Sequence, residues 1–103
     1  MIFPLEKDEK ECIQCIISEL RKEENHDLFE VDHKNEKYRL YYSEVEQKIK
    51  IWRFRPLFPE LVASIDPQKN LIIIEKSYKD EFKIKREDVK EIIMEVCLRI
   101  LAI

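Results

Sequence analysis

The stretch that decides the fold is "LVASIDPQKNLIIIEK", residues 61–76, in which two apolar segments flank a short polar one. Segments 61–65 and 71–76 are rich in β-branched residues, which is typical of strands. Between them, Pro67 follows an aspartate that can bond to its own backbone, a combination that favours a tight turn. A parallel connection needs about a dozen residues or more, so strands this close in sequence are expected to pair antiparallel.

The alternation of apolar and polar residues continues on both sides of this hairpin. Strands are predicted at 28–33, 38–42 and 48–55, and a short edge strand is predicted at 81–85. The connections are short, so we expect an antiparallel meander of 4–6 strands. Residues 71–74 are all apolar, which predicts a strand that is covered on both faces.

A helix is predicted at each end of the meander. Over residues 5–24, apolar side chains recur with the helical period and share one face. The residues on that face are Leu5, Cys12, Ile13, Ile16, Ile17 and Leu20. The last helix opens with Glu87 and Asp88, acids suited to the positive end of the helix dipole, and runs to the end of the chain. The expected fold class is α+β, a single globular domain over residues 1–103 with both helices on one sheet face.

The composition excludes several kinds of site. Hydrophobic residues make up 45% of the chain and charged residues 40%, enough for a core and a densely charged exterior. The net charge is −3, so no general attraction to nucleic acids or anionic membranes is expected. There is no glycine, which excludes P-loop, dinucleotide-binding and α/β-hydrolase sites, because their loops need positive φ or close backbone approach.

Cysteine usage and the chain start bear on the cellular location. The start lacks the features of a signal peptide, and no run approaches the roughly 20 apolar residues of a membrane span. Three cysteines, an odd number, argue against a secreted disulfide framework. We therefore expect a cytoplasmic protein with reduced thiols and no membrane partner. The abundance of Ile, Lys, Glu and Asn favours a bacterial or phage source.

Two cysteines and two histidines have the chemistry of zinc ligands but not the spacing. Cys12 and Cys15 are followed by His26 and His33, and neither the gap between the pairs nor the histidine spacing fits a zinc finger. The cysteines lie within a helical pattern, where a reduced cysteine behaves as a small hydrophobe. A redox pair would usually lie at a helix N-terminus. We expect Cys12 and Cys15 to pack in or near the core, and no metal or other cofactor.

Catalysis is not expected either. A serine or cysteine nucleophile usually needs a histidine base beside it, and the chain offers only two histidines and no recognisable nucleophile elbow. Paired carboxylates stay open as a catalytic alternative, although most of the acids fall on helix surfaces. The sequence therefore favours a non-enzymatic protein.

The segment "KIKIWRFRPLF", residues 48–58, interleaves basic and aromatic residues. Such a pattern can supply phosphate contacts and stacking surfaces for a nucleic acid. The candidate nucleic-acid-binding residues are Lys48, Lys50, Trp52, Arg53 and Arg55. The structural alternative is that the aromatic residues enter the core while the cations line a sheet edge, where they would discourage edge-to-edge association.

The last helix carries two apolar stripes, and the second is the favoured binding surface. The first stripe is expected to face the sheet and contains Val89, Ile92, Ile93, Val96, Cys97, Ile100 and Ile103. The second stripe consists of Met94, Leu98 and Leu101, and it needs a cover of its own. That cover is the N-terminal helix, a second subunit or another protein. Glu95 and Arg99 are spaced for a helical ion pair.

The expected function follows from the second stripe. We expect a non-enzymatic protein-binding module, such as a regulator, an inhibitor or a chaperone-like protein, that forms a homodimer through its C-terminal helix. Nucleic-acid binding by residues 48–55 is the alternative.

Overall fold

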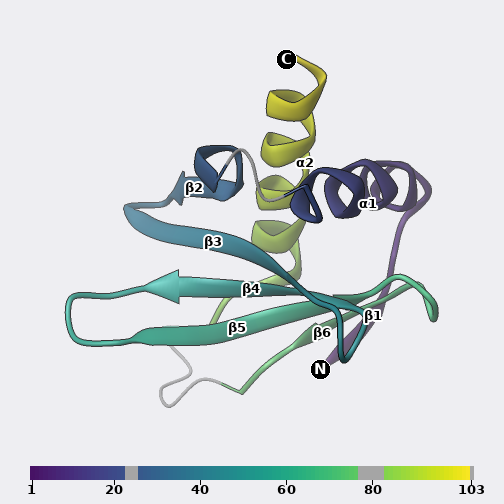
Figure 1. Ribbon diagram of the computed structural model, residues 1–103. Helices are drawn as coiled ribbons and strands as arrows, with labels where there is room; N and C mark the ends of the chain where they lie inside the picture. Colours follow the sequence, from purple (N-terminus) through teal and green to yellow (C-terminus); the bar gives the residue numbers. More distant parts are fainter. Residues whose placement is uncertain (23–25, 77–82, 103) are drawn as a thin grey trace.

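The computed structural model describes residues 1–22, 26–76 and 83–102. In order, the elements are β1 (Ile2–Pro4), α1 (Lys7–Leu20), the 3-10 helix η1 (His26–Phe29), β2 (Glu30–His33), β3 (Glu36–Ser43), β4 (Lys48–Phe54), β5 (Pro59–Asp66), β6 (Leu71–Ile74) and α2 (Arg86–Leu101). The predicted α+β fold, in which one helix precedes an antiparallel meander and another follows it in the chain, is confirmed. Both helices lie on the same side of the sheet, as expected (Figure 1).

The sheet has six strands in the order β1-β6-β5-β4-β3-β2, and all pairs are antiparallel. Strands β2 to β6 follow one another as a meander. Strand β1 was not predicted, because a three-residue strand is too short to have a visible period. It adds to the free edge of β6, where Phe3 pairs with Ile72.

Helix α1 begins two residues later than predicted, because the chain before it is committed to β1. Leu5 is nevertheless buried, as its place in the apolar pattern implied. The helix start is stabilised by the backbone N–H of Glu6, which donates to Glu9 Oε1 over 2.7 Å. Glu9 is fully buried and its carboxylate also accepts from the Arg86 guanidinium, which joins the beginnings of the two helices.

The turns are built without glycine. Among the described residues, positive φ occurs at Lys34 (49°), Asn35 (65°), Gln47 (55°) and Asn70 (56°). Lys34 and Asn35 form the two-residue connection between β2 and β3, a turn type that requires positive φ at both positions. Asparagine adopts this conformation more readily than other residues with a β-carbon, so the fold places two of its asparagines where glycine would be usual.

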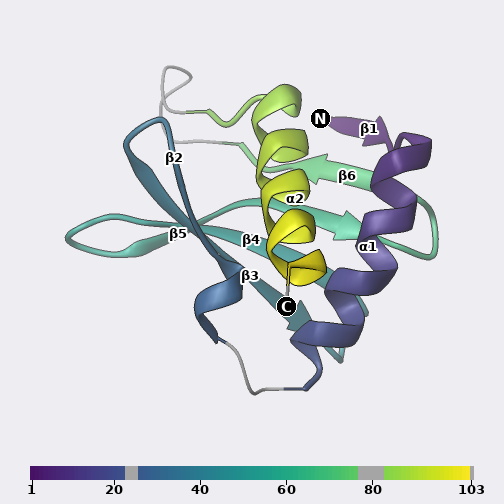
Figure 2. The ribbon, with the colours of Figure 1, turned by 90° about the horizontal axis from the view of Figure 1, so that it is seen from above.

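The core lies between the sheet and the two helices. The sheet contributes isoleucines that are fully buried, among them Ile49, Ile51, Ile65 and Ile72. Helix α2 crosses this face and buries its first stripe, which confirms that part of the prediction (Figure 2). The buried members of that stripe are Val89, Ile92, Ile93, Val96 and Cys97. Ile100 is partly buried against the core, and Ile103 lies outside the described residues.

In the part of the chain that the structure describes, no helix lies over the opposite face of the sheet, so the prediction that β6 is covered on both faces is wrong. In β6, Ile72 and Ile74 are buried, but Leu71 and Ile73 are only partly so; the strand is therefore not fully covered on both faces. The edge strand predicted at 81–85 falls partly outside the described residues, and its described part, 83–85, is not a strand. No helix in the described part of the chain has the length and apolar character needed to cross a membrane.

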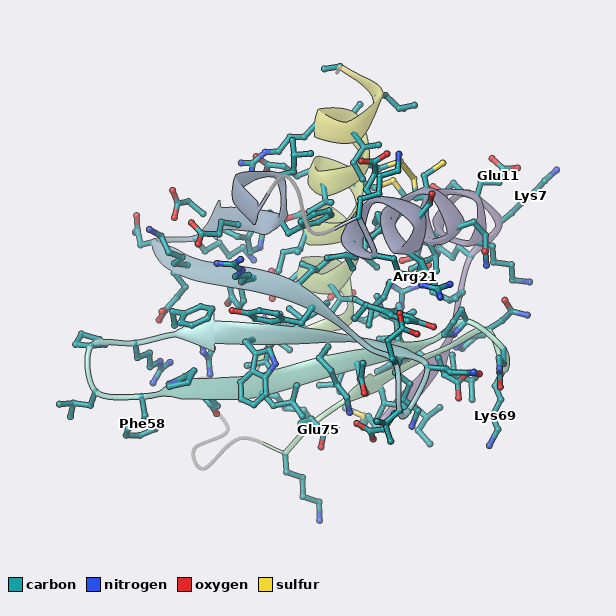
Figure 3. All side chains as sticks on the ribbon, viewed as in Figure 1. Lys7, Glu11, Arg21, Phe58, Lys69 and Glu75 are labelled. Atoms are coloured by element: carbon teal, nitrogen blue, oxygen red, sulfur yellow. A yellow bond between two sulfur atoms is a disulfide. The ribbon has the colours of Figure 1, made fainter. Side chains whose placement is uncertain are left out.

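A disulfide between Cys12 and Cys97 joins α1 to α2, with a Cα–Cα distance of 5.7 Å. Figure 3 shows it as a yellow bond between the two helices. Cys12 packs against the core, as predicted, but the same prediction is wrong for Cys15, which lies to the side of the buried face of α1 and is exposed and free. The disulfide contradicts the expectation of reduced thiols. That expectation relied on the odd number of cysteines, which does not show that Cys12 and Cys97 lie close together in the fold.

Candidate functional site

The outward side of α2 is a partly uncovered apolar surface. Leu98 and Leu101 retain 68% and 70% of their accessible surface, while Met94 is half-buried. Beside them runs a shallow groove lined by Glu91, Met94, Glu95, Leu98, Arg99 and Ala102. We call Met94, Leu98 and Leu101 the α2 stripe. It brings together the three residues that the sequence singled out for partner binding.

Helix α1 covers only one end of the α2 stripe. Cys12 Sγ lies 3.8 Å from Met94 Sδ, so α1 reaches Met94. Leu98 and Leu101 lie further along α2, where α1 leaves them exposed. The N-terminal helix therefore accounts for the Met94 end of the stripe, and the two leucines have no cover within the described part of the chain.

Charged side chains of both signs flank the α2 stripe. Arg99 Nη2 donates to Glu95 Oε1 over 3.0 Å, the i, i+4 pair expected from the sequence. The other terminal nitrogen of Arg99 donates to the backbone carbonyl of Glu30 at the start of β2. Glu91 and Glu95 also line the groove. A surface with acids and a base beside an apolar stripe can pair with a copy of itself.

The basic–aromatic segment of β4 is divided between the two faces of the sheet. Ile49 and Ile51 are fully buried beneath the helices, so alternation places Lys48, Lys50 and Trp52 on the uncovered face. Arg53 is on the covered face, where it is 3% exposed and its Nη2 donates to Glu60 Oε2 over 2.8 Å.

The structural alternative for this segment is wrong on both counts. Trp52 and Phe54 are only partly buried and do not enter the core. Strand β4 lies between β3 and β5, so its cations do not line a sheet edge. Arg55 pairs with Glu36 at 3.5 Å. Of the five candidate nucleic-acid-binding residues, three share the uncovered face, while Arg53 holds a buried ion pair and Arg55 a partly buried one.

Strand β3 adds residues to the uncovered face that sequence reasoning missed. Arg39 pairs with Trp52 across the strands, and Tyr41 pairs with Lys50. The Arg39 guanidinium carbon lies 5.0 Å from the centre of the Tyr41 ring, a cation–π contact. Arg39 also pairs with Glu30 at 3.0 Å, and Lys50 pairs with Glu46 at 2.8 Å. Finding this group from sequence would have required the register of β3 against β4.

Phe58 projects from the same side of the sheet, away from the helices (Figure 3). It is 63% exposed and follows β4 in the connection to β5. We call Arg39, Tyr41, Lys48, Lys50 and Trp52 the open-face group. Phe58 extends the aromatic character of this face towards one end of the sheet.

A third cluster joins the β2–β3 turn to the start of α2. His33 Nε2 lies 2.9 Å from Asp88 Oδ1 and 3.3 Å from Glu91 Oε2, and Lys34 Nζ lies 2.8 Å from Asp88 Oδ1. Burial alone would raise the pKa of Asp88, but hydrogen bonds from Lys34, His33 and the adjacent backbone outweigh it and lower that pKa to about 2. The zinc set weighed from the sequence does not form, because Cys12 is in the disulfide and His33 lies beside Asp88.

Comparison with known proteins gives no further assignment. No family model, no curated protein and no solved structure matches the chain.

Proposed function

We propose that this protein is a non-enzymatic binding module that forms a homodimer through the α2 stripe and regulates, inhibits or shields a protein partner. The observation that carries the proposal is the exposure of Leu98 and Leu101, 68% and 70%, on a helix whose other side is buried in the core. Two large apolar side chains beside a groove are typical of a surface that another protein covers.

A second copy of the chain is the occupant that fits this surface best. In an antiparallel pairing of two α2 helices about a twofold axis, each copy contributes the same patch. Leu98 would then lie near the middle, and the flexible side chain of Met94 would adapt to the contact at its end. Glu91, Glu95 and Arg99 line the groove beside this contact, where Arg99 is already paired with Glu95 of its own chain.

Sedimentation-velocity measurements over a concentration series test the homodimer. Leu98→Ala or Leu101→Ala is expected to weaken association by roughly tenfold, because each removes apolar area that the dimer buries. Leu57→Ala is the matched control, since Leu57 is 88% exposed but lies in the β4–β5 connection. This control is expected to dimerise like the unaltered protein.

Circular dichroism and thermal melting of the same variants separate binding from folding. Leu98→Ala and Leu101→Ala are expected to melt at the same temperature as the unaltered protein in its monomeric form. A monomeric unaltered protein at the highest attainable concentration would contradict the homodimer, and so would equal association in the α2 variants and in Leu57→Ala.

Nucleic-acid binding is the second candidate, and the open-face group favours it. Three cations and two aromatic rings lie on one uncovered sheet face, in alternation across β3 and β4. Bases of a single strand can stack on such rings while the cations contact phosphates. We propose a single strand because its unpaired bases are free to stack on aromatic rings of a sheet face. Arg53 and Arg55 are left out of this proposal because Arg53 is buried on the covered face and Arg55 lies beyond the end of β4, where it pairs with Glu36.

Tryptophan fluorescence tests the second candidate directly. Trp52 is the only tryptophan of the chain, so a base stacking on it should quench the whole tryptophan signal. Titration with single-stranded RNA is expected to quench this signal, with an affinity that falls with salt at a log–log slope of about −0.7 per contacted phosphate. Lys50→Ala is expected to reduce that slope, whereas Lys10→Ala, on exposed α1 surface, should not. Unchanged fluorescence at low salt would contradict RNA binding by this face.

The cellular location is part of the proposal, and we place the protein in the cytoplasm. The Cys12–Cys97 pair provides the test, because disulfides persist mainly in oxidising compartments. Thiol alkylation under denaturing conditions as the producing cells are lysed, which makes the buried Cys97 accessible, is expected to label all three cysteines. Labelling of Cys15 alone would contradict a cytoplasmic location.

A further inference from the structure

The side chains of His33, Asp88 and Glu91 point their ligand atoms at one small volume. One nitrogen and two carboxylate oxygens all lie within 4.8 Å of one another. His33 ends β2, and the two acids lie one turn apart at the start of α2. The set therefore joins two elements that are far apart in the sequence, and none of it belongs to the α2 stripe or to the open-face group.

Two of the three distances within this cluster are close to those around a bound metal ion, and all three ligand atoms lie within 4.8 Å of one another. Two ligands at about 2.0–2.2 Å from a tetrahedral zinc ion lie roughly 3.3 Å apart. His33 Nε2 lies 3.3 Å from Glu91 Oε2 and 2.9 Å from Asp88 Oδ1. Imidazole nitrogen with carboxylate oxygen is also a ligand combination that divalent zinc and its neighbours accept.

A cation already occupies part of this volume. The ammonium group of Lys34 lies 2.8 Å from the same Asp88 oxygen that His33 contacts. Lys34 is 68% exposed at its side chain, so its ammonium can move into water without disturbing the core. Asp88 thus pairs with a positive charge that lies on a largely exposed side chain.

We propose that His33, Asp88 and Glu91 bind one divalent transition-metal ion of the zinc class, which takes the place of the Lys34 ammonium. His33 and Asp88 have side-chain exposures of 12% and 11%, so they are held in position by the fold. Glu91 is 59% exposed and closes onto the ion from the solvent side. Water completes the coordination, as in other sites with three protein ligands.

Two proton and hydrogen-bond changes accompany metal binding. His33 Nε2 must carry no proton, so neutral His33 holds its proton on Nδ1 when the ion is bound. Asp88 Oδ1 exchanges Lys34 for the ion, while Oδ2 keeps its hydrogen bond from the backbone N–H of Lys85 at 3.0 Å. That second hydrogen bond orients the carboxylate towards the ion. The metal would then fasten the β2–β3 turn to the first turn of α2.

Isothermal titration with ZnCl2, and the visible absorption of bound Co2+, test this site. The unaltered protein is expected to bind one ion per chain. His33→Gln should weaken binding by at least about tenfold, the range seen when a metal site loses a positioned group. Lys34→Ala should strengthen binding, because it removes the competing cation. A purely structural ion cluster would not respond to Lys34→Ala in this direction.

Two control variants assign the signal to this cluster. Cys15→Ser removes the free exposed thiol, and Glu95→Gln changes an acid one turn beyond Glu91 that pairs with Arg99. Both controls are expected to bind metal like the unaltered protein. The proposal is overturned by one-site binding that His33→Gln leaves unchanged, by loss of binding in Cys15→Ser, or by no binding at millimolar metal. Because Glu91 and Glu95 also line the groove beside the α2 stripe, the same titrations in the Leu98→Ala background separate metal binding from dimerisation.

Discussion

Buried charged side chains in this protein lie against specific partners of opposite charge. Glu9 is fully buried and is held by Arg86, while Arg53 is 3% exposed and is held by Glu60. Burial tends to lower the pKa of Arg53, but its hydrogen bonds to Glu60 and Tyr38 outweigh burial and raise it. Removing one member of such a pair leaves the other uncompensated, which is why these residues are structural and not available to a ligand.

Asp88 makes the free energy of unfolding depend on pH in the acidic range. Its pKa is lowered from 3.8 to about 2 in the folded protein, so between these values the unfolded chain binds more protons than the folded one. Its contribution, about 2 kcal/mol, is therefore complete above roughly pH 4 and is lost as the pH falls towards 2. Urea unfolding across this range should show the decline in the unaltered protein and a shallower one in Asp88→Asn.

The matched control for Asp88 is Asp8, another aspartate in the first turn of a helix but with a side chain that is 57% exposed. Asp8→Asn should follow the unaltered protein. Equal slopes in Asp88→Asn and the unaltered protein would contradict the assigned role of Asp88.

Among the elements, the two helices depend on each other as well as on the sheet. The disulfide between Cys12 and Cys97 closes a loop with a sequence separation of 85, and Glu9 pairs with Arg86 near the other end of the contact. The α2 stripe begins at Met94, beside Cys12, so the position of α1 limits how much of that stripe is exposed.

Reducing the disulfide is expected to lower the free energy of unfolding by about 4 kcal/mol, because the unfolded chain regains the entropy that a long closed loop removes. Denaturant titration with and without dithiothreitol measures the difference. Cys97→Ser should reproduce the reduced state and then show no further response to dithiothreitol. Cys15→Ser should behave like the unaltered protein, and a loss of the dithiothreitol effect in that variant would contradict the pairing.

Helices and strands were predictable where one buried face makes apolar residues recur at regular intervals along the sequence. The isoleucine-rich strands and the first stripe of α2 were found because their apolar residues repeat at two or at 3.6 residues. The position of strand β4 in the sequence was predicted correctly. The side of the sheet on which Trp52 lies was not, because both faces of β4 mix charged and apolar residues. The group around His33 depends on a contact with Asp88 across 55 positions, which no local pattern encodes.

At the scale of the whole molecule, the two proposed binding surfaces lie on opposite sides of the sheet. The helices, with the α2 stripe, cover one side, and the open-face group lies on the other (Figures 1 and 2). A dimer formed through α2 would leave both open faces accessible. The two candidate functions are therefore compatible in one assembly, and a variant of either surface should leave the other intact.

The pairing of β1 with β6 predicts an order of folding. Neighbouring strands β3, β4 and β5 close short loops, whereas Phe3 reaches Ile72 only by closing most of the chain, which costs more entropy. Stopped-flow kinetics should show that Phe3→Ala speeds unfolding with little effect on the folding rate, whereas Ile51→Val slows folding. A slower folding rate in Phe3→Ala would contradict this order.

This order has a consequence during synthesis. Strand β1 is synthesised well before β6 (Leu71–Ile74), the strand with which it pairs in the sheet. Until the ribosome has released that segment, β1 has no edge to join. A nascent chain arrested before Leu71 should therefore expose the β1 segment to protease while the earlier meander is already forming, and the free edge of β5 would be open to any other extended chain nearby.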